Sequence, residues 1–424
     1  MLGAALLVGC LPAAPPNVSS ATLPVGYYGS SYITKTAAVY DMLSRQRVVV
    51  LMQQDGDEPA GHCWLECCPE KDWDPVGRCQ GGGGTSRAVP LNASLNPGCN
   101  PGCDQHGKQV REFGIIKRTA RQAGRPLPHA VLYMNSVYDW PFDAAHGKGA
   151  QNIDVLDIHG NPHAEQCDPG IYPSFFLDHG RPAGQAAFLD TFKKYVQGGD
   201  TADGVYLDCF DQMPLSCKGG GPCKAIRNKK GNNASIVSRA TVTNYISGKK
   251  AGLSAATKLV AQQSGGIFTA KTWDVQKSHD PYGANTAIRD AKDPIQMAAM
   301  VDTLMRKNGY KHILIGGGYS NLRRDPTDVA SVCSGYEVAK FLLGFEPGCF
   351  LICQGWADDF EKALGDPLGP ATWQGGQVFF RAFASGTNVS WTNGTQQFEI
   401  QWSDGTTSGP DAPADNASPV RIPN

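Results

Sequence analysis

The 424-residue chain has no excess of charge of either sign and no long hydrophobic run. Its 38 basic and 39 acidic residues leave a formal net charge of −1. Because nucleic-acid binding depends on a strongly basic surface, this composition predicts no nucleic-acid partner. No apolar run reaches the roughly 18–20 residues that cross a bilayer, so we expect no transmembrane segment.

Several catalytic signatures are also missing. The sequence contains no Gly-x-Ser-x-Gly motif of serine hydrolases and no His-Glu-x-x-His motif of zinc proteases. No glycine-rich phosphate turn follows the first predicted strand, which ends at Gln53, so an open doubly wound sheet is only the second choice for the fold. We therefore expect no organic cofactor, and no ligand spacing supports a calcium site.

Cysteine, by contrast, is abundant. Its 14 copies include clusters at 63–103, 209–223 and 333–353, which in an oxidising compartment predict disulfides that staple the loops. A zinc site is the alternative, because His106 follows Cys99-x-x-x-Cys103, but the paired ligand spacing of a zinc finger does not recur. If Cys10 leaves with a signal peptide, 13 cysteines remain, so at least one is unpaired or intermolecular.

The N-terminus and the asparagines also indicate export. Residues 1–14 form an apolar run with a small-residue end, which predicts a signal peptide without its usual basic start. Leu7-Val8-Gly9-Cys10 also resembles a bacterial lipoprotein cleavage box. We predict a secreted or cell-surface glycoprotein, with glycosylation sequons at Asn17, Asn92, Asn233, Asn388, Asn393 and Asn416.

Short apolar runs alternate with longer amphipathic stretches along most of the chain, which predicts parallel strands crossed over by helices. We predict strands at 47–53, 129–134, 171–177, 204–207, 266–270, 285–289, 312–315 and 349–353. Helical periodicity predicts helices at 110–123, 185–196, 240–263, 294–307 and 336–343.

Eight such units predict an α/β fold of the (β/α)8 TIM-barrel type over 20–375. Cys-rich insertions at 58–105 and 215–233 interrupt the pattern. A small β appendage is predicted at 376–404, where two alternating runs flank Asn393-Gly394, and the tail at 405–424 is predicted to be disordered.

Barrel enzymes place their active site at the C-terminal ends of the strands. The residues that follow the predicted strands are rich in carboxylates and aromatics. Glycoside cleavage uses two carboxyl groups, and aromatic faces stack on sugar rings, so this rim favours carbohydrate chemistry. Eight residues are predicted to contact substrate: Asn135, Tyr138, Asp139, Trp140, Asp178, Asp211, Trp273 and Trp356. The plainer alternative is that each Asp caps a helix or closes a turn, and that the tryptophans pack under loops.

Asp208 is the strongest catalytic candidate, because it ends the apolar run Gly204-Val205-Tyr206-Leu207. The surrounding segment PSFFLDHGRPAGQAAFLDTFKKYVQGGDTADGVYLDCFD, at 173–211, resembles a stretch of TIM-barrel glycoside hydrolases, in particular the hypothetical glycoside hydrolase-like families. LYMNSVYDWPF at 132–142 and ALGDPLGPATWQGGQVFFRAFASGTNVSW at 363–391 are similar to other segments of that group.

The resemblance covers 25–402 in patches and omits both Cys-rich insertions. It implies that Asp208 is the nucleophile or base on the fourth strand. The acid partner is expected on a later strand, where Asp274 and Asp290 are the candidates and no Glu occurs at either position.

The sequence therefore predicts a secreted glycoside hydrolase that acts on an oligo- or polysaccharide. A competing hypothesis is a catalytically inactive extracellular protein that binds carbohydrate or serves a structural role on the same barrel. A third is a polysaccharide lyase, for which Tyr138, Tyr319 and Lys271 are candidate bases.

Overall fold

The computed structural model describes residues 22–29, 37–51, 105–139, 155–156, 159, 164–166, 173–208, 215–217, 223–225, 236–263, 268–271, 284–285, 291, 293–307, 312–316, 333–353, 355–395 and 397–409. The predicted signal peptide and the first Cys-rich insertion up to residue 104 lie outside this part of the chain. None of the helices in these ranges combines the length and the apolar character needed to cross a membrane.

Eight strands, all paired in parallel, close into a barrel in the order β1-β14-β13-β12-β11-β7-β3-β2. This confirms the predicted α/β class with a curved parallel sheet. The strands are β1 (Val25–Gly29), β2 (Val48–Leu51), β3 (His129–Asn135), β7 (Gly204–Asp208), β11 (Phe268–Lys271), β12 (Ala284–Asn285), β13 (Ile313–Gly316) and β14 (Cys349–Ile352).

The prediction that residues 171–177 form a barrel strand is wrong. Within it, β6 (Pro173–Phe176) pairs antiparallel with β4 (Tyr138–Asp139) and β5 (Ala164–Gln166), in a small sheet separate from the barrel. An apolar run such as PSFF fits a buried strand of either kind, so the run alone does not identify its partners.

The first barrel strand, β1, was not predicted, because its sequence VGYYG carries two glycines. Packing explains Gly26: a Cβ there would lie 2.2 Å from Cγ1 of Val48 and 2.7 Å from Cδ1 of Ile352. The predicted strand at 171–177 is not in the barrel, and the unpredicted β1 is. The strand that ends at Asp208 is therefore still the fourth barrel strand along the chain.

Helices connect the barrel strands and cover the outside of the barrel. They are α1 (Ala37–Arg45), α3 (Gln105–Gln122), α5 (Pro182–Tyr195), α6 (Arg239–Gln263), α7 (Pro294–Asp302) and α8 (Gly335–Gly344). The predicted helix at 294–307 is divided, because a π-helix (Thr303–Lys307) follows α7 directly. Helix α1 was not predicted, and the remaining predicted helices correspond to α3, α5, α6 and α8.

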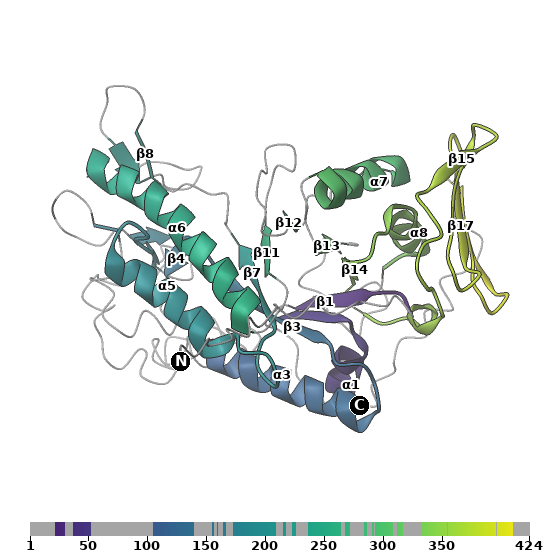
Figure 1. The fold of residues 1–424 in the computed structure, drawn as a ribbon, viewed down its shortest axis with the longest axis horizontal. Coiled ribbons are helices and arrows are strands. Elements are labelled where there is room, and N and C mark those ends of the chain that lie inside the picture. Colours follow the sequence, from purple (N-terminus) through teal and green to yellow (C-terminus); the bar gives the residue numbers. More distant parts are fainter. Residues whose placement is uncertain are drawn as a thin grey trace, which may run out of the picture.

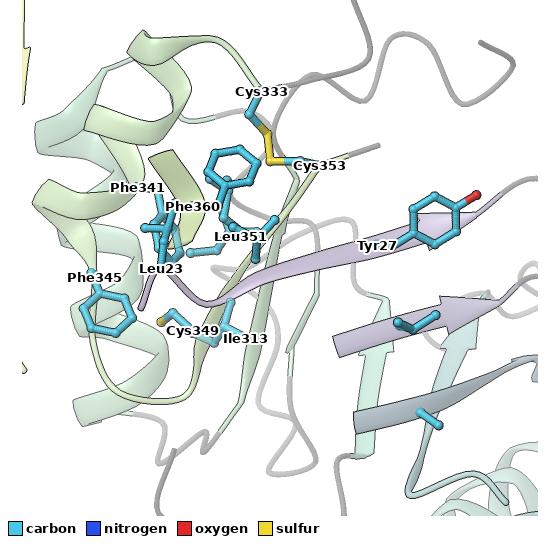
Figure 2. Packing of buried hydrophobic residues seen from close by; sticks show 14 of the residues in the cluster. Leu23, Tyr27, Ile313, Cys333, Phe341, Phe345, Cys349, Leu351, Cys353 and Phe360 are labelled. Carbon is cyan, nitrogen blue, oxygen red and sulfur yellow. A yellow bond between two sulfur atoms is a disulfide. The ribbon is translucent and has the colours of Figure 1, made fainter. Parts of the chain in front are cut away.

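Side chains alternate between two cores along each barrel strand, as a closed sheet requires. On β14, Cys349 and Leu351 belong to the cluster between barrel and helices, whereas Phe350 and Ile352 belong to the cluster inside the barrel. Figure 2 shows Phe341 and Phe345 of α8 beside the outward-facing residues of β13 and β14. Each buried side chain of this kind contributes about 1.5–3 kcal/mol.

A second small sheet follows β7. It consists of β8 (Leu215–Cys217), β9 (Cys223–Ala225) and β10 (Ile236–Val237), and the disulfide Cys217–Cys223 links two of its strands. The described part of the predicted insertion at 215–233 is therefore an antiparallel sheet. It shares a core with the β4–β6 sheet and α6 through Phe176, Leu215 and Tyr245. We call the two small sheets, together with the first half of α6, the flanking lobe.

The C-terminal part forms a five-stranded antiparallel sheet that packs on α8 (Figure 1). Its strands are β15 (Thr372–Gln374), β16 (Val378–Ala382), β17 (Asn388–Thr392), β18 (Gln397–Gln401) and β19 (Thr407–Ser408). The sheet thus extends beyond the predicted appendage at 376–404, and β19 lies in the stretch predicted to be disordered. Arg381 anchors it, because its guanidinium donates to the carbonyl of Leu343 at the end of α8 and to Glu346.

Candidate functional site

The C-terminal ends of β3 and β7 meet side by side in the barrel wall. In the parallel ladder Asn135, the last residue of β3, is the register partner of Asp208, the last residue of β7. Two residues earlier, Tyr133 is the partner of Tyr206. The sequence placed both Asn135 and Asp208 after strands; the structure places them in the final rungs of neighbouring strands.

Three tyrosines fill the barrel interior one layer below this pair. The rings of Tyr133 and Tyr206 stack at 5.6 Å between centroids, and Tyr28 of β1 lies 5.2 Å from Tyr206 and 6.3 Å from Tyr133. All three are buried, with Tyr133 the most exposed at 8%. The interior beneath Asn135 and Asp208 is therefore packed with rings and is not a pore, as expected for a barrel with its site at one end.

Asn135 is nearly buried, and its conformation is fixed by its own turn. Its Oδ1 accepts a hydrogen bond of 2.9 Å from the backbone N–H of Val137. Since the amide oxygen is engaged by the backbone, the amide nitrogen is the donor end of this side chain. A donor of this kind suits a sugar hydroxyl or a neighbouring carboxylate.

Asp178 lies in a turn outside the barrel. It follows β6, which lies outside the barrel, and its buried carboxylate accepts from the backbone N–H of Gly180 at 2.8 Å. Burial raises the pKa of the Asp178 carboxyl, and the Gly180 N–H and the charge of Arg181 oppose that rise. The carboxylate closes a local turn ahead of α5, which is the plainer alternative for an Asp after a strand.

Trp356 also has a structural position. It follows β14, is only 6% exposed and packs edge-to-face on Phe360 with ring centroids 5.5 Å apart. A ring enclosed in the core cannot stack on a sugar, so we leave Trp356 out of the candidate site.

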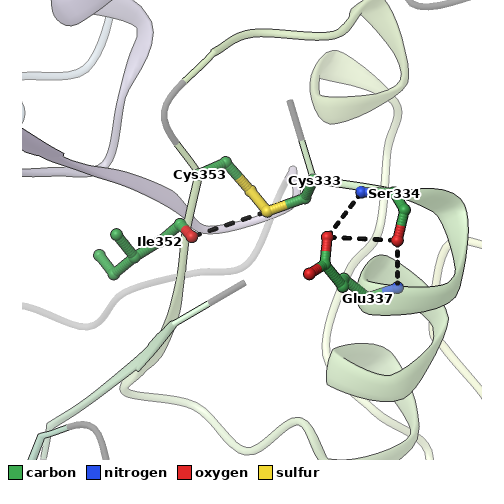
Figure 3. The surroundings of a disulfide bond; sticks show 5 residues. All are labelled: Cys333, Ser334, Glu337, Ile352 and Cys353. Atoms are coloured by element: carbon green, nitrogen blue, oxygen red, sulfur yellow. Dashed lines mark hydrogen bonds between the residues drawn. A yellow bond between two sulfur atoms is a disulfide. The ribbon is translucent and has the colours of Figure 1, made fainter. Parts of the chain in front are cut away.

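The segment before Trp356 is held covalently at the C-terminal end of the barrel. Cys353, just after β14, forms a disulfide with Cys333, just before α8 (Figure 3). Directly after Cys333, Ser334 and Glu337 form a reciprocal capping box that fixes the first turn of α8. The remaining described unpaired cysteine, Cys349, is buried, and burial raises the pKa of its thiol to about 12, so it is not a reactive thiol.

For the other predicted site residues, the structure gives a position in a strand or does not describe the residue. Tyr138 and Asp139 form β4, directly beyond the end of β3. Lys271 is the last residue of β11. Trp140, Asp211, Trp273, Asp274, Asp290 and Tyr319 lie outside the described residues. The predicted strand at 285–289 overlaps β12 (Ala284–Asn285) at Asn285, and its other residues lie outside the described part of the chain.

Two of the six predicted glycosylation sites are described. Asn393 is exposed next to Gly394, in the turn between β17 and β18. Asn388 lies in β17, where its Nδ2 donates to the carbonyl of Gly386 at 3.0 Å. Asn17, Asn92, Asn233 and Asn416 lie outside the described residues.

Within the described ranges, His, Cys, Asp and Glu nowhere gather in a group of three that could hold a metal. His106, the third residue of the zinc alternative, is buried on α3 against the ring of Tyr195 at 5.6 Å. Its two companions in that alternative, Cys99 and Cys103, lie outside the described residues.

Sequence reasoning missed the part played by His179. Its Nε2 lies 2.7 Å from the carbonyl oxygen of Ser136, the residue after Asn135. The two residues are 43 positions apart in the sequence, so no local pattern reveals this contact. The only sequence signal is a polar Asp-His pair at the end of an apolar run.

Comparison with known proteins gave structural likenesses only. No family model and no curated protein matches the chain. Among solved structures, an α-amylase from Geobacillus thermoleovorans in complex with acarbose is 10% identical, with a TM-score of 0.42 over 91% of this chain and 90% of that one. A maltogenic α-amylase from Thermotoga neapolitana is 9% identical, with a TM-score of 0.39 over 89% of this chain and 84% of that one. An α-amylase from Malbranchea cinnamomea is 8% identical, with a TM-score of 0.41 over 88% and 84%.

These structures are α-amylases, and this chain is similar to them in structure. At such identities and TM-scores the likeness carries no argument about activity, so the functional conclusion below depends on the residues of this chain.

Proposed function

We propose that this chain is a secreted glycoside hydrolase built on a (β/α)8 barrel, with Asp208 as the nucleophile or base at the C-terminal end of the fourth strand. The single observation that carries the proposal is the position of Asp208 in the closed ring of parallel strands, beside Asn135. Catalytic groups of barrel enzymes lie at this end, on the residues that terminate the strands.

Strand alternation adds a second argument. Asp208 shares the face of β7 that carries Tyr206, and Tyr206 packs in the barrel interior with Tyr28 and Tyr133. The end of β7 thus lies above a packed layer of tyrosine rings in the barrel interior. A carboxylate at such a site can attack an anomeric carbon or activate a water, provided that a second carboxyl group protonates the leaving oxygen.

The second carboxyl group is proposed to be Asp274, after the fifth strand, or Asp290, after the sixth. The proposed substrate contacts are completed by Asn135, Tyr138, Asp139, Trp140, Asp211 and Trp273, which come at or soon after the ends of β3, β7 and β11 in the sequence. A separation of the two carboxyl groups of about 5 Å would give retention of configuration, and about 6.5–9.5 Å would give inversion.

The proposal is tested by a glycan screen that measures released reducing ends. We expect wild type to release them from at least one oligo- or polysaccharide, and Asp208→Asn to lose at least about 10³-fold in kcat/KM, as when other enzymes lose an essential catalytic side chain. The matched control is Asp200→Asn, which changes an exposed carboxylate paired with Arg121. Comparable activity of Asp208→Asn and wild type would contradict the proposal, and glycan binding without cleavage would favour an inactive carbohydrate-binding protein.

A further inference from the structure

A fully buried histidine joins the flanking lobe to the end of β3. His179 has no exposed surface, and its Nε2 lies 2.7 Å from the carbonyl oxygen of Ser136. Ser136 follows Asn135 directly, and the next residue, Val137, donates to Oδ1 of Asn135. The histidine therefore contacts the turn that fixes the Asn135 side chain.

The protonation of this ring follows from its partners. A backbone carbonyl only accepts hydrogen bonds, so Nε2 carries the proton, and Nδ1 has no hydrogen-bond partner among the described residues. Burial, together with the positive charge of Lys249, lowers the pKa of His179 to about 3. The ring is thus a neutral hydrogen-bond donor at working pH and not a proton shuttle.

Two helices hold the ring in place. Phe188 of α5 and Tyr245 of α6 contact it edge-to-face, with centroids at 5.0 and 5.6 Å. The α6 backbone passes so close that a Cβ at Gly248 would lie 1.8 Å from the carbonyl oxygen of His179, and one at Gly180 would lie 2.7 Å from the backbone nitrogen of Tyr245. Gln185 of α5 donates to that same His179 carbonyl at 2.8 Å. Ring and backbone therefore have little freedom to move.

We propose that His179 is a positioning residue, which through its hydrogen bond to Ser136 holds Asn135 next to Asp208 for contact with a sugar hydroxyl at the reacting bond. This inference rests on the proposed glycosidase function. The geometric argument is that His179 connects two well-packed helices to the last rung of β3, whereas Asn135 itself lies where the barrel strand ends. Loss of the His179 hydrogen bond would remove the contact between the buried ring and the carbonyl of Ser136, in the middle of the Asn135–Val137 turn.

The test compares three variants in a kinetic assay and in thermal unfolding. His179→Leu removes the donor, His179→Gln retains an N–H at the same place along the side chain, and Phe188→Leu loosens the packing under the ring but leaves the hydrogen bond. We expect His179→Leu to lower kcat by about 30- to 100-fold, since a misplaced catalytic contact costs on this scale. His179→Gln should stay within about threefold of wild type, and Phe188→Leu should lower the melting temperature with kcat nearly unchanged. If kcat in all three variants falls only in step with the melting temperature, the role is merely structural and the proposal is wrong.

A second readout separates this inference from the proposed function. Amide hydrogen exchange at Val137 reports the turn directly and requires no substrate. We expect at least about tenfold faster exchange in His179→Leu than in Phe188→Leu or His179→Gln. Equal exchange at Val137 in all three variants overturns the positioning role even if the enzyme is active. If wild type cleaves no glycan, the glycosidase proposal fails, and faster exchange confined to His179→Leu would still support the positioning of Asn135 by His179.

Discussion

Strands β3 and β7 lie side by side across the barrel wall, yet their two ends satisfy polar groups in opposite ways. At the N-terminal end, the buried Lys117 of α3 lies 2.8 Å from the Asp203 carboxylate and donates to the carbonyls of Gly199 and Thr201. The same Asp203 oxygen accepts from the backbone N–H of Ala130, at the start of β3. At this end, the charges of Lys117 and Asp203 are therefore both paired within the protein.

At the C-terminal end the same strands finish with an amide, Asn135, beside a carboxylate, Asp208. A neutral histidine and a disulfide hold the surrounding segments there. Charge at the N-terminal end therefore serves stability, whereas we propose that charge at the C-terminal end serves the reaction. That division makes separable predictions for the two ends.

The largest effect on stability is expected at the N-terminal end. Lys117→Met should lower the free energy of unfolding by about 4 kcal/mol, because Asp203 and two carbonyls lose their buried partner. Chemical denaturation measures the change. Arg121→Met is the matched control on the same helix, and it should cost less than about 0.5 kcal/mol, since the Arg121–Asp200 pair is exposed. If Lys117→Met costs as little as the control, the buried ion pair does not stabilise the N-terminal end of the barrel.

A smaller loss is expected from the covalent link at the other end. Removing the disulfide by Cys333→Ala with Cys353→Ala should cost about 3 kcal/mol, because the bond closes a loop of 20 residues. The control is Cys217→Ala with Cys223→Ala, whose loop of 6 residues predicts about 2 kcal/mol. Denaturant titration of both double variants, under oxidising conditions, tests the order. The reverse order would show that loop length does not govern the effect here.

A third effect is expected in the pH dependence of stability, where each single pH unit contributes less than either disulfide. His179 stays neutral in the folded protein down to about pH 3, whereas the unfolded chain binds that proton below about pH 6.5. Between these values the unfolded state holds one more proton, so the free energy of unfolding falls by about 1.4 kcal/mol for each unit that the pH is lowered. We expect His179→Gln to lack this component when denaturation is measured between pH 7 and pH 4. Parallel slopes for the two proteins would mean that the ring is protonated in the folded state.

The sequence predicts seven of the eight barrel strands, because runs of aliphatic residues such as VVVL, ILIG and CFLI are typical of buried parallel strands. It fails at β1, whose Gly26 is dictated by contacts with β2 and β14 that no local pattern reveals. It fails in the opposite sense at β6, where a good strand sequence pairs locally and outside the barrel.

Some residues of the candidate site could likewise be predicted from the sequence, and others could not. Asp208 could be selected from the sequence, because an acidic residue that ends an apolar run is a local signal. The roles of His179 and Trp356 could not, since burial and the contacts with Ser136 and Phe360 arise only when segments pack together. Asp178 shows the ambiguity that remains: an acidic residue after a strand closes a turn as readily as it serves a reaction.

The most direct test of the division between the two ends measures kcat/KM and the free energy of unfolding for Asp208→Asn and Lys117→Met in parallel, at a temperature at which both remain folded. We expect Asp208→Asn to lose at least about 10³-fold in kcat/KM with its stability within about 1 kcal/mol of wild type. Lys117→Met should lose about 4 kcal/mol of stability with kcat/KM within about threefold of wild type. Activity and stability that fall together in both variants, or an Asp208→Asn protein as active as wild type, would contradict the account.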